Sequence, residues 1–362
     1  MQTRLGARGD HGIALVIVML VVFILAAIAG GFAYSMRVEM RLARNSNYDA
    51  DLEWLGRSGV ELARFVIAEQ AKIPNEGSYE ALNQKWAGGL SQNTNSSISD
   101  ISLENYQLGA GTISVKIIDQ ERKFNINLAD DAIIRQALLL MMGVDASSFP
   151  EVVDSILDWI DLDNDPHLGG AESDYYLGLT PAYTAKNGLI DNLSELLLIK
   201  GITPEMYWGT GAGDHPVTLF HQPPRKLLPG DQPSFPVGLV DLFTTMSSGR
   251  ININTASVDA LQMIPDIDLN TAQNIIKLRA GPDGVEGNED DVPFRNAGEL
   301  VNVPGLSRQT VQQLTRYCDV HSHTFEVQVD AEINGAHRKF TAVLRRSNTN
   351  VQDLQMLFLH WK

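Results

Sequence analysis

An acidic loop between residues 161 and 172 holds the densest group of side chains able to do chemistry. Carboxylates occupy positions 1, 3, 5 and 12 of this segment, namely Asp161, Asp163, Asp165 and Glu172. This is the spacing of oxygen ligands in an EF-hand loop, where the final Glu binds calcium through both carboxylate oxygens. Several carboxylates held together without a cation repel one another, so the spacing predicts a calcium site.

The sixth position of this loop argues against a true EF-hand. It is Pro166, and proline cannot adopt the positive φ with which glycine turns the backbone there. We therefore expect a different calcium loop built from the same carboxylates, with Asp158 and Asp174 as additional ligands. The alternative interpretation is a solvated helix end, at which Asp side chains cap backbone groups.

A second acidic loop, residues 281–291, combines glycines with oxygen-bearing side chains. Its candidate ligands are Asp283, Glu286, Asn288, Asp290 and Asp291. Calcium takes about six to eight oxygen ligands, and backbone carbonyls of a flexible loop can complete that number. An acidic surface turn between two helices has the same composition, and the sequence leaves open whether the two loops form one site. Neither loop has the Cys or clustered His that zinc or copper favour.

The composition excludes several classes of function. The net charge of −16 repels nucleic acid and anionic lipid. Cys318 is the only cysteine, so no internal disulfide forms, and we expect it to be a small buried hydrophobic residue. No nucleophile motif, phosphate-binding glycine loop or zinc-hydrolase pattern occurs. A glycosidase needs two carboxylates at a defined separation across a cleft, which runs of Asp do not predict, so we expect no enzyme.

Two segments between residues 253 and 314 resemble helix-hairpin-helix repeats. The first begins with Ile253-Asn254-Thr255-Ala256, and the second contains Val303-Pro304-Gly305-Leu306. In nucleic-acid-binding members of that family, glycine N–H groups of the hairpin contact a phosphate. Here the first hairpin reads Pro265-Asp266-Ile267-Asp268, and its two negative charges repel DNA. We expect structural or protein-binding repeats. The competing hypothesis is a membrane-anchored DNA receptor of the competence type.

The first forty residues predict a membrane anchor. A short basic leader ends at Gly12, and an apolar segment of about 24 residues follows, from Ile13 to Met36. At ~1.5 Å per residue, a helix of this length spans the ~30 Å hydrocarbon core of a bilayer. A removed signal peptide fits this length less well, although the small residues Gly30, Gly31 and Ala33 provide a cleavage site before Tyr34.

Beyond the span, the apolar spacing predicts an α+β fold. The helix continues to Pro74 with an amphipathic face made of Leu52, Leu55, Gly59, Ala63 and Val66. β-branched segments and the Asn334-Gly335 turn signal predict strands at 112–118, 123–128, 325–333, 337–345 and 352–361. Helical spacing predicts helices at 132–142, 152–160, 192–198, 256–264, 271–278 and 308–317. The simplest arrangement is a small antiparallel sheet packed on the long helix, with a helical domain inserted between its strands.

The leader, its terminal glycine and the long amphipathic helix resemble a type IV prepilin or a type II secretion pseudopilin. The resemblance implies that prepilin peptidase cleaves after Gly12 and that the new terminus, Ile13, is methylated. Most pilins carry Glu at the fifth mature position, whereas this chain has Ile17. A carboxylate in lipid costs about 2.5 kcal/mol or more unless a neighbouring subunit compensates it, and a subunit at the fibre tip has no neighbour ahead of it. Ile17 is therefore what a resemblance to K-type minor pseudopilins, the general secretion pathway protein K family, leads us to expect.

The acidic segment supports the same resemblance. Asp158-Trp159-Ile160-Asp161, Gly170-Ala171-Glu172 and Tyr175-Tyr176 look like the Asp-rich signature of K-type pseudopilins. The resemblance covers nearly the whole chain and implies structural calcium in the helical domain. It also implies a single-pass protein of the bacterial inner membrane, mostly periplasmic, that initiates and caps the pseudopilus exporting folded proteins across the outer membrane.

The resemblance further implies how the chain is divided and what it contacts. The expected parts are a prepilin leader (1–12), a transmembrane helix (13–36), a pilin-like helix continuation with the first strands (37–128), an inserted α-domain (129–320) and returning strands (321–362). The implied partners are the I- and J-type minor pseudopilins, other pseudopilins, prepilin peptidase and the inner-membrane secretion platform. Nucleic acid is not expected among them.

Overall fold

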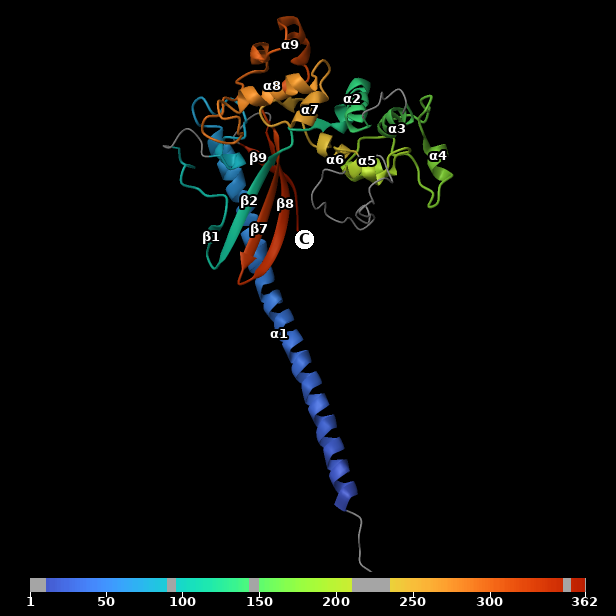
Figure 1. Cartoon of the computed structure of the whole chain (residues 1–362), viewed down its shortest axis with the longest axis vertical. Helices are drawn as coiled ribbons and strands as arrows, with labels where there is room; N and C mark the ends of the chain where they lie inside the picture. The colour runs from blue at the N-terminus through green and yellow to red at the C-terminus, as the bar shows by residue number, and fades with distance from the viewer. Residues whose placement is uncertain (1–10, 90–95, 143–149, 210–234, 348–352, 362) are drawn as a thin grey trace, which may run out of the picture.

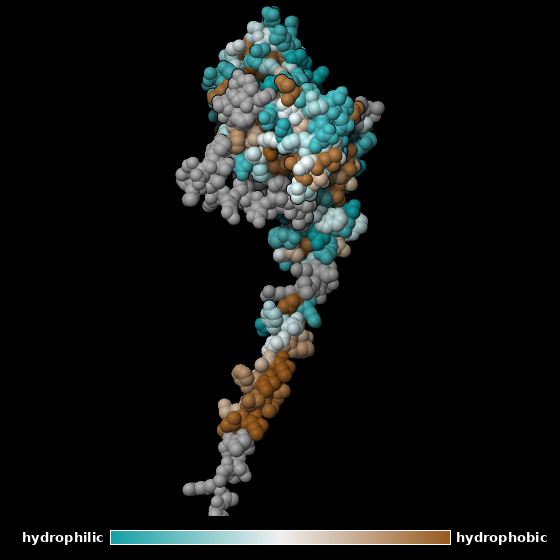
Figure 2. Space-filling model, turned by 90° about the vertical axis from the view of Figure 1, so that its right-hand side faces the viewer, coloured by the Kyte–Doolittle hydropathy of each residue, from teal (hydrophilic) through white to brown (hydrophobic). Residues whose placement is uncertain are grey.

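One long helix carries an apolar segment away from the globular part of the chain. The computed structural model describes residues 11–89, 96–142, 150–209, 235–347 and 353–361, and helix α1 runs from His11 to Gln70. Within its segment Leu15–Met40, the most apolar window of 18 residues has a mean hydropathy of 3.0 and is not buried within the chain. Figure 2 shows the apolar surface of this helix in brown. Such a surface fits a hydrocarbon environment, where a helix satisfies all its own backbone hydrogen bonds.

The apolar span ends later than the sequence predicts. The expected end was Met36, whereas the candidate span reaches Met40. Val38 and Met40 are both exposed apolar side chains, so the apolar surface continues past the charged residues Arg37 and Glu39. Long charged side chains near the end of a span can reach the interface while their stems stay in the apolar region.

The upper half of α1 packs against a five-stranded antiparallel sheet (Figure 1). The strand order is β1-β2-β7-β8-β9, with bounds β1 Tyr106–Leu108, β2 Gly111–Asp119, β7 Thr324–Ile333, β8 Ala336–Arg346 and β9 Leu354–Trp361. Gly56 and Gly59 allow the helix to approach this sheet closely. A Cβ atom would lie 2.4 Å from Phe340 at the first position and 2.5 Å from Val329 at the second. The apolar face predicted on the helix is buried here, which confirms that prediction.

Four of the predicted strands are confirmed, and the strand predicted at Lys123–Leu128 is wrong. Only Phe124–Asn125 is extended, as β3, and it pairs in parallel with β4, Phe243–Thr244. Residues Ile126–Leu128 form a 3-10 helix, η2, because the Asn125 side chain accepts a hydrogen bond from Asn127 N at 3.0 Å. A side chain that caps its own backbone in this way competes with strand pairing.

Helices and short strands fill the chain between β2 and β7. The α-helices are α2 Asp131–Met142, α3 Pro150–Ile160, α4 Ser173–Leu177, α5 Pro204–Trp208, α6 Leu239–Leu242, α7 Val258–Gln262, α8 Leu269–Arg279 and α9 Arg308–Leu314. The 3-10 helices are η1 Lys85–Ala87, which precedes the sheet, η4 Leu193–Leu198 and η5 Ala297–Asn302. A parallel pair, β5 Ile251–Asn252 and β6 Cys318–Asp319, completes the elements.

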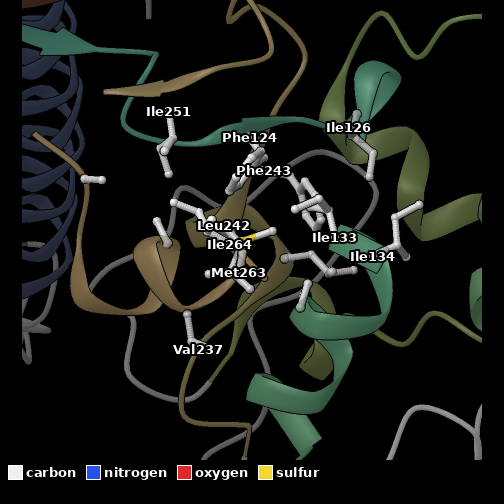
Figure 3. Packing of buried hydrophobic residues seen from close by; sticks show 14 of the residues in the cluster. Phe124, Ile126, Ile133, Ile134, Val237, Leu242, Phe243, Ile251, Met263 and Ile264 are labelled. Atoms are coloured by element: carbon white, nitrogen blue, oxygen red, sulfur yellow. The ribbon is translucent and has the colours of Figure 1, made fainter. Parts of the chain in front are cut away.

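These helices share a second hydrophobic core, separate from the core under the sheet. Figure 3 shows part of this core, with Phe124 and Phe243 among side chains from α2 and from the α7 region. All six helices predicted from the sequence are present, although the one predicted at 192–198 is the 3-10 helix η4. Cys318 is buried in this core, as predicted.

A buried polar cluster joins the sheet to the inserted helices. It consists of Glu80, Asp119, Asn252, Ser322 and Arg346, which we call the junction cluster. Arg346, at the end of β8, forms an ion pair with Glu80, and both side chains are at most 5% exposed. The Asn252 side chain donates to Glu80 O at 3.1 Å, to Ser322 Oγ at 2.8 Å and to Asp119 Oδ2 at 3.3 Å. Because these residues come from distant parts of the sequence, their bonds fix the helical insert on the sheet.

Candidate metal centre

The first acidic loop leaves α3 and returns at α4, so that carboxylates from both of its ends meet. Asp158 lies in the last turn of α3, Asp161 follows that helix directly, and Glu172 immediately precedes α4. Ligand atoms of Asp161, Asp163 and Glu172 lie within 4.8 Å of one another, and so do those of Asp158, Asp161 and His167. Asp161 belongs to both groups, so the two form one continuous cluster, which we call the carboxylate cluster.

Four carboxylate oxygens of this cluster are buried without a hydrogen-bond partner among the described residues. They are Asp158 Oδ2, Asp161 Oδ1 and both oxygens of Glu172. Asp158 is completely buried, and Glu172 is 5% exposed. Leaving a buried polar atom unpaired costs about 1–3 kcal/mol, and more for a charged group. The donor set therefore fits a hard cation such as Ca²⁺, which takes carboxylate oxygens as ligands.

The electrostatics of the cluster agree with this fit. Burial raises the pKa of Asp161, and the neighbouring carboxylates of Asp163 and Asp158 raise it further. Burial also raises the pKa of Glu172, with added contributions from Asp158 and Asp161. A carboxyl group with a raised pKa is one whose negative charge is poorly compensated. A divalent cation would supply the missing positive charge and reverse the direction of these shifts.

Hydrogen bonds from His167 and Lys200 stabilise the conformation of the first acidic loop. His167 N donates to Asp158 Oδ1 at 3.1 Å, and the His167 ring contacts the same oxygen. Lys200 Nζ donates to the carbonyl oxygens of Gly169 and Gly170, at 3.1 and 3.3 Å. These bonds use Oδ1 of Asp158, whereas Oδ2 is buried beside Gly170 without a donor among the described residues.

Gly170 lies so close to the carboxylate cluster that it admits no side chain. A Cβ atom at this position would lie 1.9 Å from Asp158 Oδ2. We expect Gly170→Ala to displace the Asp158 carboxylate, to weaken calcium binding and to lower the free energy of unfolding by about 1–3 kcal/mol, the usual cost of overpacking. Calorimetric calcium titration and urea denaturation measure the two effects.

Gly188→Ala is the matched control, because its Cβ would meet no atom closer than 3.8 Å. Equal calcium affinities of the two variants would contradict the placement of Asp158 among the ligands.

Two of the predicted ligands lie outside the cluster. Asp165 and Asp174 are exposed and belong to neither group of converging ligand atoms. The backbone N–H of Asp165 donates to Asp163 Oδ1 at 3.0 Å, so Asp165 supports the turn through its backbone.

Two residues of this site, His167 and Asp154, carry no signal in the sequence. Contact with Asp158 raises the pKa of His167, and Asp154 Oδ2 accepts a hydrogen bond from Gly169 N at 3.0 Å. A single histidine nine residues after Asp158 does not match any known spacing of metal ligands, so the sequence does not predict that it contacts Asp158. Only the reversal of the chain between α3 and α4 brings it there.

The second acidic loop is closed by hydrogen bonds among its own residues. Asn288 Nδ2 donates to Asp283 Oδ2 at 2.8 Å, and Asp290 N donates to Asn288 Oδ1 at 3.1 Å. Gly287 N donates to Asp291 Oδ2 at 2.8 Å, while Asp291 Oδ1 is buried without a partner among the described residues.

Glu286 of this loop has a different role from that of a free ligand. It forms an ion pair with the buried Arg279, whose guanidinium also donates to the carbonyl oxygens of Ile253 and Ala256. In the part of the chain that the structure describes, no three acidic or histidine ligands gather in this loop or across both loops. Figure 1 shows α4, beside the first loop, and α8, before the second, in different parts of the helical region.

The helix-hairpin-helix segments adopt the expected local geometry. Helices α7 and α8 flank the first hairpin, where Asp266 has a positive φ of 65°. Asp268 caps α8 by accepting a hydrogen bond from Thr271 N at 2.8 Å, which lowers the pKa of its carboxyl group. The hairpin therefore presents two carboxylates where a phosphate-binding hairpin presents glycine N–H groups. Gly305, with a φ of 97°, makes the corresponding turn between η5 and α9.

A long apolar helix packed on an antiparallel sheet, with helices inserted between two neighbouring strands, defines a pilin-like protein with an inserted domain. Residues 122–208 match a family model described as "Type II secretion system (T2SS), protein K", and residues 247–318 match one described as "Helix-hairpin-helix motif". Type II secretion system protein K of Pseudomonas aeruginosa is 26% identical over 78% of this chain and 76% of its own length. The Aeromonas hydrophila protein of the same name is 23% identical over 95% of both chains.

A solved structure has the same fold. It is the GspK-GspI-GspJ complex from the type 2 secretion system of enterotoxigenic Escherichia coli, one chain of which superposes with a TM-score of 0.61 and 17% identity. The match covers 88% of this chain and 99% of that one. The chain is similar to protein K, a minor pseudopilin of type II secretion systems, in its fold, in the segment that matches the family model and over most of the length of these relatives. Among the described residues, one helix, at the N-terminus, is long and apolar enough to cross a membrane.

Proposed function

We propose that this chain forms the tip of the type II secretion pseudopilus, where it initiates and caps assembly of the fibre that exports folded proteins. The observation that carries the proposal is the position of the helical insert. It lies between β2 and β7, at the end of the sheet away from the apolar span (Figure 1). A subunit stacked above this one would have to occupy the volume of the insert, whereas subunits below it meet only α1 and the sheet.

The anchor supports a position at the tip. Ile17 lies on the apolar face of α1, where most pilins carry a glutamate that pairs with the subunit ahead. We propose that prepilin peptidase cleaves between Gly12 and Ile13 and that Ile13 becomes methylated. Both residues lie at the start of α1, while the leader, 1–10, is outside the described residues. The bulk of the chain would then face the periplasm.

Mass spectrometry of the N-terminus, on protein from membranes of the native host, tests this proposal. A methylated Ile13 is the expected result. An intact Met1, or a terminus near Tyr34, would instead indicate an ordinary anchor or a removed signal peptide.

The proposed neighbours are the I- and J-type minor pseudopilins, followed by other pseudopilins and the inner-membrane platform. The related E. coli protein was solved in a complex with GspI and GspJ, which supports the first two. We infer no catalytic activity, since protein K is a structural component. The acidic hairpin of Asp266 and Asp268 argues against the DNA-receptor alternative, which salt-dependent duplex binding by the full chain at low micromolar concentration would revive.

We propose that calcium stabilises the helical insert through Asp158, Asp161, Asp163 and Glu172. The cation would link the end of α3 to the start of α4 and so fix the loop between them. The second loop, where Asp291 Oδ1 is buried without a partner among the described residues, is the proposed location of a second ion. Two calcium ions per chain would support both sites, and a single ion that is lost in Glu172→Gln would assign the first loop alone.

A further inference from the structure

The edge strand β9 is more exposed than an edge strand of a stable monomer should be. Its residues 354–361 read Leu-Gln-Met-Leu-Phe-Leu-His-Trp, and four apolar side chains are 38–49% exposed: Met356, Leu357, Phe358 and Trp361. Among the described residues the strand pairs with β8 on one side only, while α1 packs on β2, β7 and β8. An apolar edge without Lys, Pro or an inward charge is a ready template for association with another chain.

The apolar side chains of β9 lie on both faces of the sheet. Phe358 is opposite Val343, and Trp361 is opposite Phe340, whose side chain faces α1. A register shift between Val343 and Leu344 leaves Leu357 as the extra residue of a bulge. A bulge bends an edge strand and changes the direction of its side chains. The surface of β9 is therefore apolar but not flat, and its outer edge has backbone groups that no other described strand pairs with.

The charges beside β9 differ in sign from those of the rest of the chain. Residues 336–362 contain five Lys or Arg and a single Asp, although the whole chain has a net charge of −16. Arg338 and Arg346 are paired with Asp49 and Glu80, whereas Lys339 and Arg345 of β8 are exposed. Lys339 has a side chain that is 79% exposed, and it lies on the same face of the sheet as Phe358, because alternate residues of β8 share a face. Two copies of β9 placed side by side would bring like charges together, which opposes self-association.

The position of β9 also restricts what can reach it. Figure 1 shows α3, α4 and α5 extending to the β8 side of the sheet, at the end far from the apolar span. A partner beside β9 therefore lies below these helices, on the membrane side, which is where the other subunits of a fibre would be if this chain occupies the tip.

We propose that β9 is the docking surface for a neighbouring minor pseudopilin, which contacts it through an apolar strip rimmed by acidic side chains. The proposal rests on the pseudopilin function proposed above. It assigns the apolar contact to Met356, Leu357 and Phe358 and the charged contact to Lys339.

Site-specific photo-crosslinking of the full chain in membranes of its native host tests the proposal. A benzophenone amino acid replaces Phe358 in one variant and Leu189 in the control. Leu189 is also an exposed apolar residue, 62% accessible, but lies in the helical region. We expect the probe at position 358 to label a second pseudopilin, identified by mass, and the probe at 189 not to label it.

Reversing the charge of Lys339 tests the electrostatic contribution to docking, because it leaves the apolar side chains of β9 unchanged. Lys339→Glu should reduce crosslinking from position 358 by about tenfold, since a close charge pair at an interface is worth one order of magnitude or more. Lys277→Glu, an exposed position on α8, makes the same change in net charge and should leave the yield unchanged.

Three outcomes would overturn the docking surface: no labelling from position 358, equal labelling from 358 and 189, or labelling only of a second copy of this chain. The terminus of the protein is read in the same sample. Correct processing at Ile13 without labelling from 358 refutes the docking surface alone, whereas an unprocessed terminus refutes the proposed function.

Discussion

Replacing Arg346 by methionine is expected to lower the free energy of unfolding by about 3–5 kcal/mol, because it leaves Glu80 buried and charged without its partner. Glu80 is only 3% exposed at its side chain, and one oxygen accepts from Ser322 N at 2.7 Å while the other pairs with Arg346. The Arg346–Glu80 pair joins β8 to the segment that follows α1, and Glu80 O accepts a hydrogen bond from Asn252 of the insert. The loss therefore measures how firmly this segment is held beside the insert. Urea denaturation of the full chain in detergent at neutral pH measures it.

The double variant Glu80→Gln/Arg346→Met separates lost charge compensation from lost packing. Glutamine keeps an oxygen that can accept from Ser322 N and carries no charge, so the double variant should recover most of the loss. Removing both charges of a buried pair is often neutral or stabilising, whereas removing one is not. Arg57→Met, which breaks an exposed i, i+4 pair with Glu53, should cost less than about 1 kcal/mol. A loss for Arg346→Met no larger than that of Arg57→Met would contradict a buried, uncompensated Glu80.

The sequence predicted the parts of the fold that depend on local pattern. The alternation of residues 325–333 and the Asn334-Gly335 turn gave the β7–β8 hairpin almost to the residue, because a strand covered on one face must alternate. The strand predicted at 123–128 is wrong because contacts outside the local pattern decide its conformation. Phe124 and Ile126 favour extension, but the Asn125 side chain and the core around Phe124 turn the chain after two residues.

The sequence predicted which carboxylates to consider but not which of them converge. EF-hand spacing gave Asp165 the same weight as Asp163, and only Asp163 joins the cluster. Asp158 was a secondary candidate, and it is the most deeply buried member, since it lies on the face of α3 turned toward the returning loop. Burial and loop closure arise from tertiary contacts such as the bonds of Lys200 to Gly169 and Gly170, which no spacing encodes.

Calcium should raise the stability of the full chain by about 2.7 kcal/mol when its free concentration is one hundred times the dissociation constant. The expected rise in the midpoint of thermal unfolding is about 5 °C relative to the same protein in chelator. Magnesium should have a smaller effect, because it requires near-octahedral geometry and gives up its water reluctantly. Scanning calorimetry in calcium, magnesium and chelator measures the three states.

The variant Glu172→Gln should differ from the parent in opposite directions with and without calcium. This change of sign in the unfolding temperature distinguishes a calcium site from an acidic turn that binds no ion. Without calcium, burial and the neighbouring carboxylates raise the pKa of Glu172, so its charge destabilises the folded state at neutral pH and the variant should unfold at the same or a higher temperature than the parent. With calcium, the variant lacks a charged ligand and should unfold at a lower temperature. Asp174→Asn, at an exposed residue outside the cluster, should follow the parent in both conditions.

The pH dependence of stability should have opposite signs in chelator and in calcium. In chelator, the raised folded-state pKa of Glu172 contributes stability that is present below the unfolded value, 4.5, and is lost as the pH rises through the folded value. In calcium, stability should instead rise with pH over the same interval, because the ion binds the deprotonated carboxylates. A solvated helix end has no reason to reverse its pH dependence when calcium is added. Parallel pH profiles in calcium and chelator would therefore favour that interpretation over a metal centre.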